Sequence, residues 1–250
     1  VECNPSSDLE TFLTAAVEAG VNRVSLGMQS AVDAERRKLG RTSDRKRVEE
    51  ALSIARKCGI QNLTLDVMLG VPGQTLKSLD ETLAFVVDSG VPHVSAYMLK
   101  LEEGTPMYEE YLNSPVLPDD DAQADMYSYA AQMLERYGYR QYEISNFSAP
   151  GFESRHNLKY WQLDDYMGFG PGAHSCVGNL RYSFVRDLKQ YVYGVARKVS
   201  IIDEYEEISP LERSVEYLML AMRTNRGVEE EEYRVRTQSD WKPILRCLEA

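Results

Sequence analysis

A chain of 250 residues is long enough to bury a full hydrophobic core, as one large domain or as a large and a small one. Hydrophobic residues make up 43% and charged residues 27%, and no run approaches the roughly 20 apolar residues that cross a bilayer. The net charge of −11 disfavours contact with a phosphate backbone. We therefore expect a cytoplasmic protein with no transmembrane segment and no nucleic-acid partner.

One basic cluster stands against this acidic background. It contains Arg36, Arg37, Lys38, Arg41, Arg45, Lys46 and Arg47, without interleaved aromatic residues. A nucleic-acid surface usually combines such charges with stacking side chains. We interpret the cluster as a solvated helix face or an anion contact.

The four cysteines are Cys3, Cys58, Cys176 and Cys247. They are scattered and form no C-x-x-C pair, so we expect reduced thiols that pack as small hydrophobic side chains. The sequence opens on Val1 without a preceding methionine, and it stops inside a helical pattern around Cys247. These features predict an excerpt of a longer protein.

Strands and helices are predicted to alternate from the start to about residue 150. After a short strand that ends near Glu2, the pattern predicts a helix over 9–17, a strand over 23–29, a helix around 48–58, a strand over 62–70, a helix over 76–88, a strand over 93–99, a helix over 121–137 and a strand over 142–147. Gly20, Gly59 and Gly90 stand where three of these helices should end. Strands separated by helices predict right-handed crossovers and a parallel sheet.

The strand patterns help to choose between an open doubly wound sheet and a barrel. In 62–69, Leu63, Leu65, Val67 and Leu69 alternate with Thr64, Asp66 and Met68, and 23–29 shows a similar alternation. A semi-polar inner face suits an open barrel with a ligand in its lumen. No G-x-G-x-x-G sequence joins a strand to a helix, which weakens a dinucleotide-binding reading.

The pattern changes after about residue 180. Pro210 should start a helix with Val215, Leu218, Met219 and Met222 facing inward, and an acidic run follows over 229–232. We predict a barrel domain over 1–180 and a small, mostly helical C-terminal domain over 181–250.

Four polar residues fall at or just after strand ends, where ligands bind in sheets of this kind. They are Glu2, Gln29, Arg41 and Asp66. Two acids, an amide and a guanidinium suit a ligand that carries amino, carboxylate and hydroxyl groups. An internal salt bridge between Arg41 and either acid would explain the same residues. The spacing leaves both interpretations open.

Five segments occur in an order that closely resembles one family. They are Glu2 to Pro5, Asn22 to Ser30, Leu39 to Arg41, Asp66 to Thr75 and Tyr142 to Phe147. Together they resemble the radical-SAM family of oxygen-independent coproporphyrinogen III oxidases (HemN) and HemW haem chaperones, over about residues 1–195. The resemblance implies a partial (β/α)6 TIM-like barrel with S-adenosylmethionine in the lumen. It also implies that Glu2, Gln29, Arg41 and Asp66 contact this cofactor.

The second half of the resemblance points to the HemW branch. Arg155 to Trp161 and Tyr166 to Ser175 resemble that branch, whose His-Asn-x-x-Tyr segment is linked to haem binding. The match makes His156 a candidate haem ligand and Tyr160 a candidate porphyrin contact, which agrees with the chemistry of imidazole. The alternative for His156 is a hydrogen bond to a loop backbone. His93 and His174 are weaker candidates, and Gly168, Gly170 and Gly172 suggest a close approach of backbones more than a phosphate cradle.

The family also implies a [4Fe–4S] cluster held by a Cys-x-x-x-Cys-x-x-Cys motif. None of the four cysteines here has that spacing, so we expect no metal ligands in this chain and the cluster motif upstream of it. Without a cluster this chain would not be a competent radical enzyme. The leading hypothesis is a HemW-like chaperone that passes haem to respiratory haem proteins. Alternatives are an oxidative decarboxylase (dehydrogenase) of coproporphyrinogen III in porphyrin biosynthesis, and a ligand-binding α/β protein without catalysis.

Overall fold

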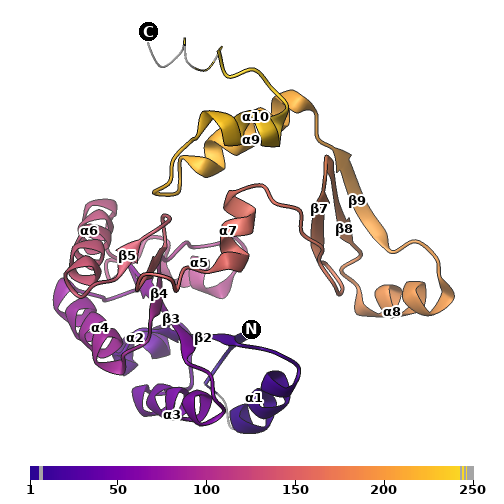
Figure 1. Cartoon of the computed structure of the whole chain (residues 1–250). Coiled ribbons are helices and arrows are strands. Elements are labelled where there is room, and N and C mark those ends of the chain that lie inside the picture. Colours follow the sequence, from indigo (N-terminus) through magenta and orange to yellow (C-terminus); the bar gives the residue numbers. More distant parts are fainter. Residues whose placement is uncertain (6–7, 243, 245, 247–250) are drawn as a thin grey trace. The chain divides into compact units, whose positions relative to one another are not determined.

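The computed structural model describes residues 1–5, 8–242, 244 and 246. The chain divides into two compact units, Val1–Glu153 and Ser154–Ala250, which Figure 1 distinguishes by colour along the sequence. The sequence pattern predicted a domain boundary at residue 180, whereas this division falls earlier, after Glu153. Residues on both sides of 180 belong to one sheet, because β7 (His174–Val177) pairs with β8 (Leu180–Phe184).

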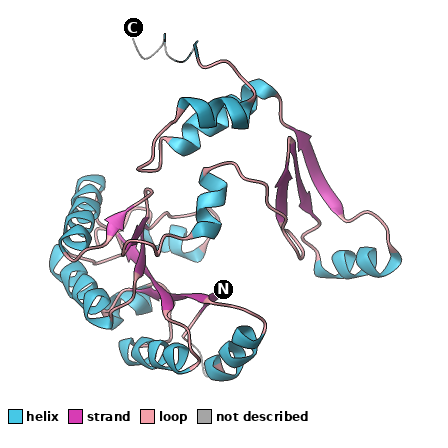
Figure 2. Ribbon diagram, in the orientation of Figure 1, coloured by secondary structure: helices cyan, strands magenta, loops and turns pink. Residues whose placement is uncertain are grey.

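The first unit contains, within its described residues, a six-stranded sheet in the order β1-β2-β3-β4-β6-β5. The strands are β1 (Glu2–Cys3), β2 (Arg23–Gln29), β3 (Asn62–Leu69), β4 (His93–Met98), β5 (Arg140–Gln141) and β6 (Asn146–Ser148). The helices are α1 (Leu9–Glu18), α2 (Asp33–Lys38), α3 (Arg45–Lys57), α4 (Leu76–Ser89), α5 (Pro106–Tyr111) and α6 (Asp120–Arg136). Strands β1 to β4 run parallel, and helices line one side of the sheet (Figure 2).

The hydrophobic core lies between the helices and one face of this sheet. Its strand residues include Val24, Leu26, Met28, Leu63, Leu65, Val67, Leu69, Val94 and Ala96, each at most 1% exposed. Burying each of the larger aliphatic side chains contributes roughly 1.5–3 kcal/mol. The alternation predicted for residues 23–29 and 62–69 is therefore confirmed, and it leaves the polar residues on the opposite, inner face.

The helices begin and end where side chains can satisfy their free backbone groups. The Asp44 carboxylate accepts a hydrogen bond from the Arg47 amide at the start of α3. Thr75 and Ser78 form a reciprocal capping box on α4, and Gly90 ends that helix with a positive φ of 65°. Such caps explain why helix ends could be predicted closely from the sequence.

The predicted strand over 142–147 differs from expectation, because it does not continue the parallel series. The chain reverses after β5, and β6 returns antiparallel to both β5 and β4, with Ser95 opposite Asn146. In the reversal the Asn146 side-chain amide donates to the Glu143 carboxylate. A turn this short can join only antiparallel strands, since a parallel connection needs a crossover of a dozen or more residues.

The second unit combines helices with a three-stranded antiparallel sheet in its described residues, β7-β8-β9. Its remaining elements are α7 (Arg155–Trp161), α8 (Leu188–Arg197), β9 (Ile202–Glu207), α9 (Pro210–Ala221) and α10 (Glu230–Thr237). The sequence pattern did not indicate this sheet. Four of the six residues of β9 are acidic and all six are exposed, so β9 lacks the apolar alternation that marks a half-buried strand.

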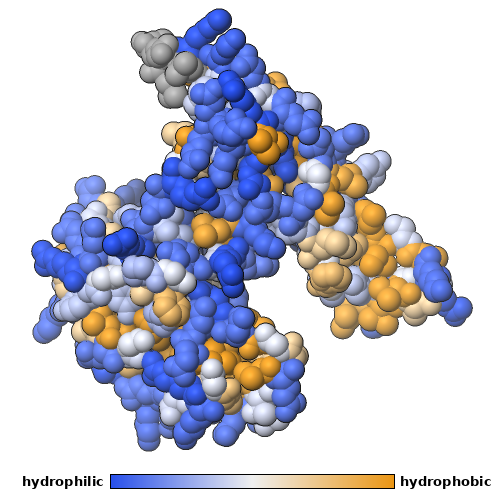
Figure 3. Space-filling view, viewed as in Figure 1, coloured by the Kyte–Doolittle hydropathy of each residue, from blue (hydrophilic) through white to orange (hydrophobic). Residues whose placement is uncertain are grey.

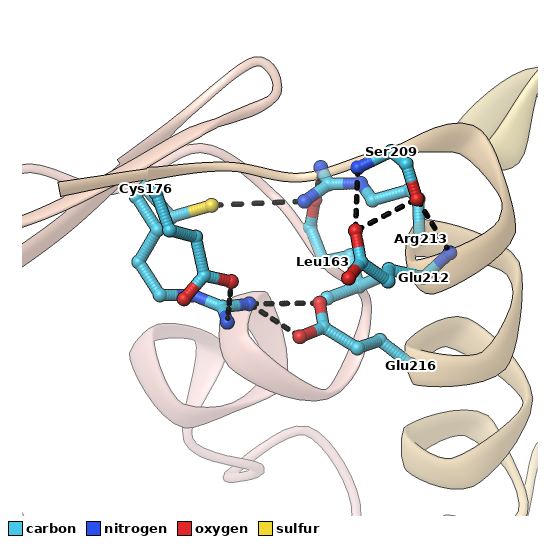
Figure 4. Close-up of polar contacts among 8 residues, drawn as sticks. Leu163, Cys176, Ser209, Glu212, Arg213 and Glu216 are labelled. Carbon is cyan, nitrogen blue, oxygen red and sulfur yellow. Dashed lines mark hydrogen bonds and ion pairs between the residues drawn. The ribbon is translucent and has the colours of Figure 1, made fainter.

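The inward face predicted for the helix at Pro210 is correct at Leu218, which packs against the small core of the second unit, and wrong at the other three positions. Helix α9 buries Arg213, Tyr217 and Ala221, whereas Val215, Met219 and Met222 are exposed. The Tyr217 ring packs edge-on against Tyr233 of α10, with ring centroids 5.8 Å apart. Figure 4 shows the Arg213 side chain extended from α9 toward Cys176 of β7, which fixes the buried face of the helix.

Exposed apolar side chains gather on parts of the second unit, including the region of α8 in Figure 3. They include Leu188, Val192, Tyr193, Val195 and Val199. In the part of the chain that the structure describes, every helix falls short of the length and apolarity that a bilayer crossing requires.

Candidate functional site

The inner face of the first sheet brings the predicted cofactor residues to neighbouring strands. The register places Glu2 opposite Ser25, and Gly27 opposite Asp66. Asp66 in turn lies opposite Ser95 of β4. Residues directly opposite one another share a face, so these side chains meet on one surface at the carboxyl ends of parallel strands.

Asp66 is a partly buried acid within this surface. Its Oδ1 accepts a hydrogen bond of 2.8 Å from the Ser25 hydroxyl. Burial raises the pKa of Asp66 to about 6; the hydrogen bond from Ser25 lowers it, the nearby charge of Glu2 raises it, and the charges of Arg23 and Arg41 lower it. Three of the four predicted cofactor residues therefore lie within electrostatic reach of one another.

Gln29 joins this group through Tyr97, a residue that the sequence analysis missed. The Tyr97 hydroxyl donates a hydrogen bond of 3.0 Å to Gln29 Oε1. Burial and the charge of Asp66 raise the pKa of Tyr97, with smaller effects from Arg41 and Glu2. A signal was present in the sequence, because His93, Ser95 and Tyr97 alternate with the core residues of β4.

Arg41 lines a pocket and forms no salt bridge with the other described residues. Its Nη1 donates to Asn4 Oδ1 at 3.2 Å, and no carboxylate of the described residues lies within 4.0 Å of it. The salt bridge to Glu2 or Asp66 that the spacing had left open is thus not formed. The guanidinium stays available for an anionic group.

A pocket of about 660 Å³ opens beside Arg41, within the size range of small-molecule sites. Its lining consists of Asn4, Pro5, Gly27, Gly40, Arg41, Thr42, Ser43, Asp44 and Arg47. Two polar side chains pack closely against Gly27, because a Cβ there would lie 3.0 Å from Gln29 Nε2 and 3.3 Å from Asn4 Oδ1. Asp66 lies opposite Gly27 on β3 and the Gln29 amide lies beside it, but neither residue lines the pocket, and nor does Tyr97.

The basic cluster needs a correction at Arg36, which is fully buried and belongs to no solvated face. Its guanidinium donates to the backbone oxygens of Met28, Ser30 and Ser43, and to the Ser43 hydroxyl. It thereby ties the end of β2, which carries Gln29, to the loop that carries Arg41. Others in the cluster do form surface ion pairs, such as Arg45 with Glu49 at 3.3 Å.

The candidate haem residues lie in the second unit, on α7. Ser154 caps this helix, and the exposed His156 stands one turn before Tyr160. The Tyr160 hydroxyl lies 3.1 Å from His156 Nε2, and the two rings meet edge-on at 5.2 Å. The partner of His156 is therefore a side chain of the same helix, and the predicted alternative, a hydrogen bond to a loop backbone, is wrong. The second ring nitrogen, Nδ1, makes no hydrogen bond to the described residues.

The other two histidines differ from each other. His93 is 1% exposed and its Nε2 lies 2.8 Å from the Tyr142 hydroxyl, so it is a buried, structural residue on the inner face of the first sheet. Burial lowers its pKa to about 3. His174 is exposed, and a Cβ on Gly168 would lie 2.4 Å from its carbonyl oxygen. That glycine serves a close backbone approach, as the sequence suggested.

The described residues contain no group of three or more His, Cys, Asp or Glu side chains that could hold a metal ion. Cys3, Cys58 and Cys176 are free thiols. Cys247 lies outside the described residues.

Comparisons with known proteins agree with this arrangement. The Radical SAM superfamily profile matches residues 1–86. The chain is 36% identical over 234 residues to the heme chaperone HemW of Bacillus subtilis, covering 93% of this chain and 62% of that protein. It is 37% identical over 177 residues to the heme chaperone HemW of Escherichia coli, covering 71% of this chain and 46% of that protein.

A solved structure shows the fold at lower identity. Coproporphyrinogen III oxidase (HemN) from Escherichia coli, a radical SAM enzyme, superposes with a TM-score of 0.82 at 18% identity. The match covers 98% of this chain and 59% of that one. The fold is therefore the α/β partial barrel of radical-SAM proteins, with a small C-terminal sheet. The chain spans about 60% of the length of the first curated relatives. The order of the strands, the polar inner face of the sheet and the similarity to these relatives all lead to one assignment. The chain belongs to the radical-SAM family that contains the HemN and HemW proteins.

Proposed function

We propose that this protein is a HemW-like haem chaperone of the cytoplasm, which binds S-adenosylmethionine on the inner face of its first sheet and haem at α7. The observation that carries the proposal is the exposed His156, whose ring is oriented by Tyr160 and whose second nitrogen is free of the described side chains. A neutral imidazole with one nitrogen hydrogen-bonded and the other open is the usual form of an axial haem ligand. Relatives named heme chaperones support the same function.

The polar inner face fits S-adenosylmethionine by its chemistry. The cofactor carries an ammonium, a carboxylate and ribose hydroxyl groups. Glu2 and Asp66 are acceptors for the ammonium or the hydroxyls, Arg41 is a donor for the carboxylate, and the missing side chain of Gly27 leaves room for close approach. In radical-SAM proteins a [4Fe–4S] cluster supplies the electron that cleaves this cofactor. We assign that cluster to the proposed whole protein and not to the cysteines described here.

Tyr97 should act by orienting the amide of Gln29. In the full protein, Tyr97→Phe removes one hydrogen bond worth about 1 kcal/mol, so S-adenosylmethionine affinity should fall roughly fivefold. Isothermal titration calorimetry measures this loss. In a Gln29→Ala background the same change should have almost no further effect, because the partner is gone. Equal losses in both backgrounds would show that Tyr97 acts independently of Gln29.

His156→Ala tests the haem site directly. Titration of haem into the full protein, followed at the Soret band, should show binding that the substitution weakens by about tenfold or more. The matched control is Lys159→Ala, which removes another exposed side chain of α7 and should leave the affinity unchanged. Unaltered binding by His156→Ala would contradict the assignment of the ligand.

The competing function is oxidation of coproporphyrinogen III, the reaction of the HemN protein whose fold this chain shares. A full protein that turns over coproporphyrinogen III without oxygen and binds no haem would replace the chaperone proposal. A full protein that binds haem and transfers it to a respiratory apo-haem protein would support it.

A further inference from the structure

We propose that Glu35 and Gln74 are positioning residues of the S-adenosylmethionine site, which together hold the carboxyl ends of β2 and β3 at a fixed separation. The inference rests on the proposed function, since it concerns the same site. Neither side chain lines the pocket beside Arg41, and each is at most 4% exposed. Any effect on the cofactor must therefore pass through the residues that they hold.

Glu35 is a buried acid of α2 that forms no ion pair with the described residues. Its Oε2 accepts hydrogen bonds from the Ser30 hydroxyl at 2.7 Å and from Gln74 Nε2 at 3.3 Å. A carboxyl group buried without a cation is costly unless hydrogen bonds compensate, and an apolar side chain would fill the space without that cost. We therefore attribute Glu35 to the two segments that its oxygen joins.

The first of these segments is the end of β2. Ser30 directly follows Gln29, the last residue of that strand, and its hydroxyl is the donor to Glu35. The next amide along the chain, of Ala31, donates to Thr82 Oγ1 on α4 at 3.1 Å. The chain that leaves Gln29 is thus fixed by α2 and by α4, and the position of the Gln29 side chain depends on both contacts.

The second segment is the loop that follows β3, the strand of Asp66. Gln74 Oε1 accepts from the Gly70 amide at 2.7 Å, and its Nε2 donates to the Met68 carbonyl oxygen at 3.1 Å as well as to Glu35. One amide therefore folds the loop back onto the end of its own strand and connects it to α2. A carboxylate at this position would lack the donor, and an apolar side chain would lack both groups.

Helix α2 contacts the same loop a second time, through Lys38. The Lys38 ammonium donates to the Pro72 carbonyl oxygen at 3.0 Å, and a Cβ on Gly73 would overlap it. On the other side, the Arg36 guanidinium donates to backbone oxygens at the end of β2. Helix α2 therefore binds both strand ends, and Glu35 is the side chain whose single oxygen reaches both.

A contribution to stability alone is the competing explanation of these contacts. Tyr139→Phe is the matched control, because the Tyr139 hydroxyl is a buried donor of the same unit, 2.7 Å from the Val91 carbonyl oxygen. Val91 precedes β4, so this bond lies at the amino ends of the strands, away from Gln29. Its loss should lower stability and leave the affinity for S-adenosylmethionine unchanged.

The test is isothermal titration calorimetry of S-adenosylmethionine with the full protein, at a temperature where circular dichroism shows every variant to be folded. Glu35→Met removes the shared acceptor and should weaken binding by about tenfold or more. Glu35→Gln can present an amide oxygen to both donors and should bind within about threefold of the wild type. Ser30→Ala removes only the bond to the end of β2 and should weaken binding by about fivefold.

Hydrogen–deuterium exchange of the unliganded protein gives a readout that is independent of the cofactor. Glu35→Met should speed exchange in the peptides that cover 28–32 and 68–75, because both segments lose the acceptor that joins them. Tyr139→Phe should leave exchange in these two peptides at the wild-type rate.

The outcomes separate this inference from the proposed function. Wild-type affinity of Glu35→Met, or equal losses in Glu35→Met and Tyr139→Phe, would overturn the positioning role, as would a Glu35→Gln variant that binds no better than Glu35→Met. If Glu35→Met does not fold, Ser30→Ala decides in its place by the same comparison with Tyr139→Phe. No binding of S-adenosylmethionine by the wild type would remove the proposed site itself, and the inference with it.

Discussion

Arg36→Met should lower the free energy of unfolding of the first unit by about 3 to 5 kcal/mol. The guanidinium is fully buried and donates to three backbone oxygens and one hydroxyl. Methionine fills much of the space but leaves those acceptors without a donor, and each such loss costs about 1–3 kcal/mol. Burial lowers the pKa of Arg36, yet the guanidinium stays charged at neutral pH, so the acceptors are bound by a cation.

Urea denaturation followed by far-ultraviolet circular dichroism measures this effect. Arg37→Met is the matched control, because Arg37 is the exposed neighbour on the same helix and its loss should change stability by less than about 0.5 kcal/mol. The Arg36 variant should also bind S-adenosylmethionine more weakly, since the loop of Arg41 would no longer be tied to the end of β2. Equal stability of the two variants would refute the structural role of Arg36.

Asp66→Asn should stabilise the protein at neutral pH, and the gain should disappear in acid. The pKa of Asp66 is about 6 in the fold against an ordinary 3.8, so the folded state holds the proton more tightly than the unfolded state does. A difference of about two pH units, at about 1.4 kcal/mol per unit, amounts to up to about 3 kcal/mol.

The direction of this pH dependence follows because the pKa of Asp66 is higher in the folded state than in the unfolded state. Below pH 3.8 the carboxyl is protonated in both states and imposes no penalty. As the pH rises through 3.8 and on through 6, stability falls, because the folded state must accommodate a charge that water would solvate better. Asparagine never ionises and avoids this loss.

The free energy of unfolding, measured from pH 3.5 to 7.5, should therefore increase for Asp66→Asn relative to the wild type as the pH rises, and the difference should level off above about pH 6. The matched control is Asp125→Asn, an exposed aspartate of α6, whose difference from the wild type should be small and flat with pH. The gain in stability should accompany weaker S-adenosylmethionine binding. An Asp66 variant no more stable than the wild type at pH 7.5 would contradict the raised pKa.

Strand positions and their faces could be predicted because alternation is a local property. One face of β3 can be identified from Leu63, Leu65 and Val67 without knowledge of any other strand. The polar residues between them identify the opposite face. Glu2, Gln29, Arg41 and Asp66 followed from the rule that ligands meet strand ends, helped by resemblance to a family. Their assignment to a cofactor stays a prediction until binding is measured.

Other features depend on partners that a sequence pattern does not display. Arg36 sits in a basic run and resembles its exposed neighbours, and its burial is explained only by the backbone oxygens that converge on it. Tyr97 carries an aromatic ring typical of any strand, and its role arises from the placement of Gln29 on β2. Helix α9 turns its apolar Val215 and Met219 outward because Arg213 and Tyr217 find specific partners inside.

The end of β2 has a consequence for how a ligand is received. The ladder between β2 and β3 shifts register between Gly27 and Gln29, and Gln29 adopts a φ of 71°, in the left-handed region that glycine favours. Holding a glutamine there costs of order 1 kcal/mol or more, which the fold bears before any ligand arrives. A ligand therefore meets an amide already locked in place by the Tyr97 hydroxyl and gives up little of its binding energy to order it. The proposed site should therefore be preorganised, with little difference at this strand end between the free protein and its complex with S-adenosylmethionine.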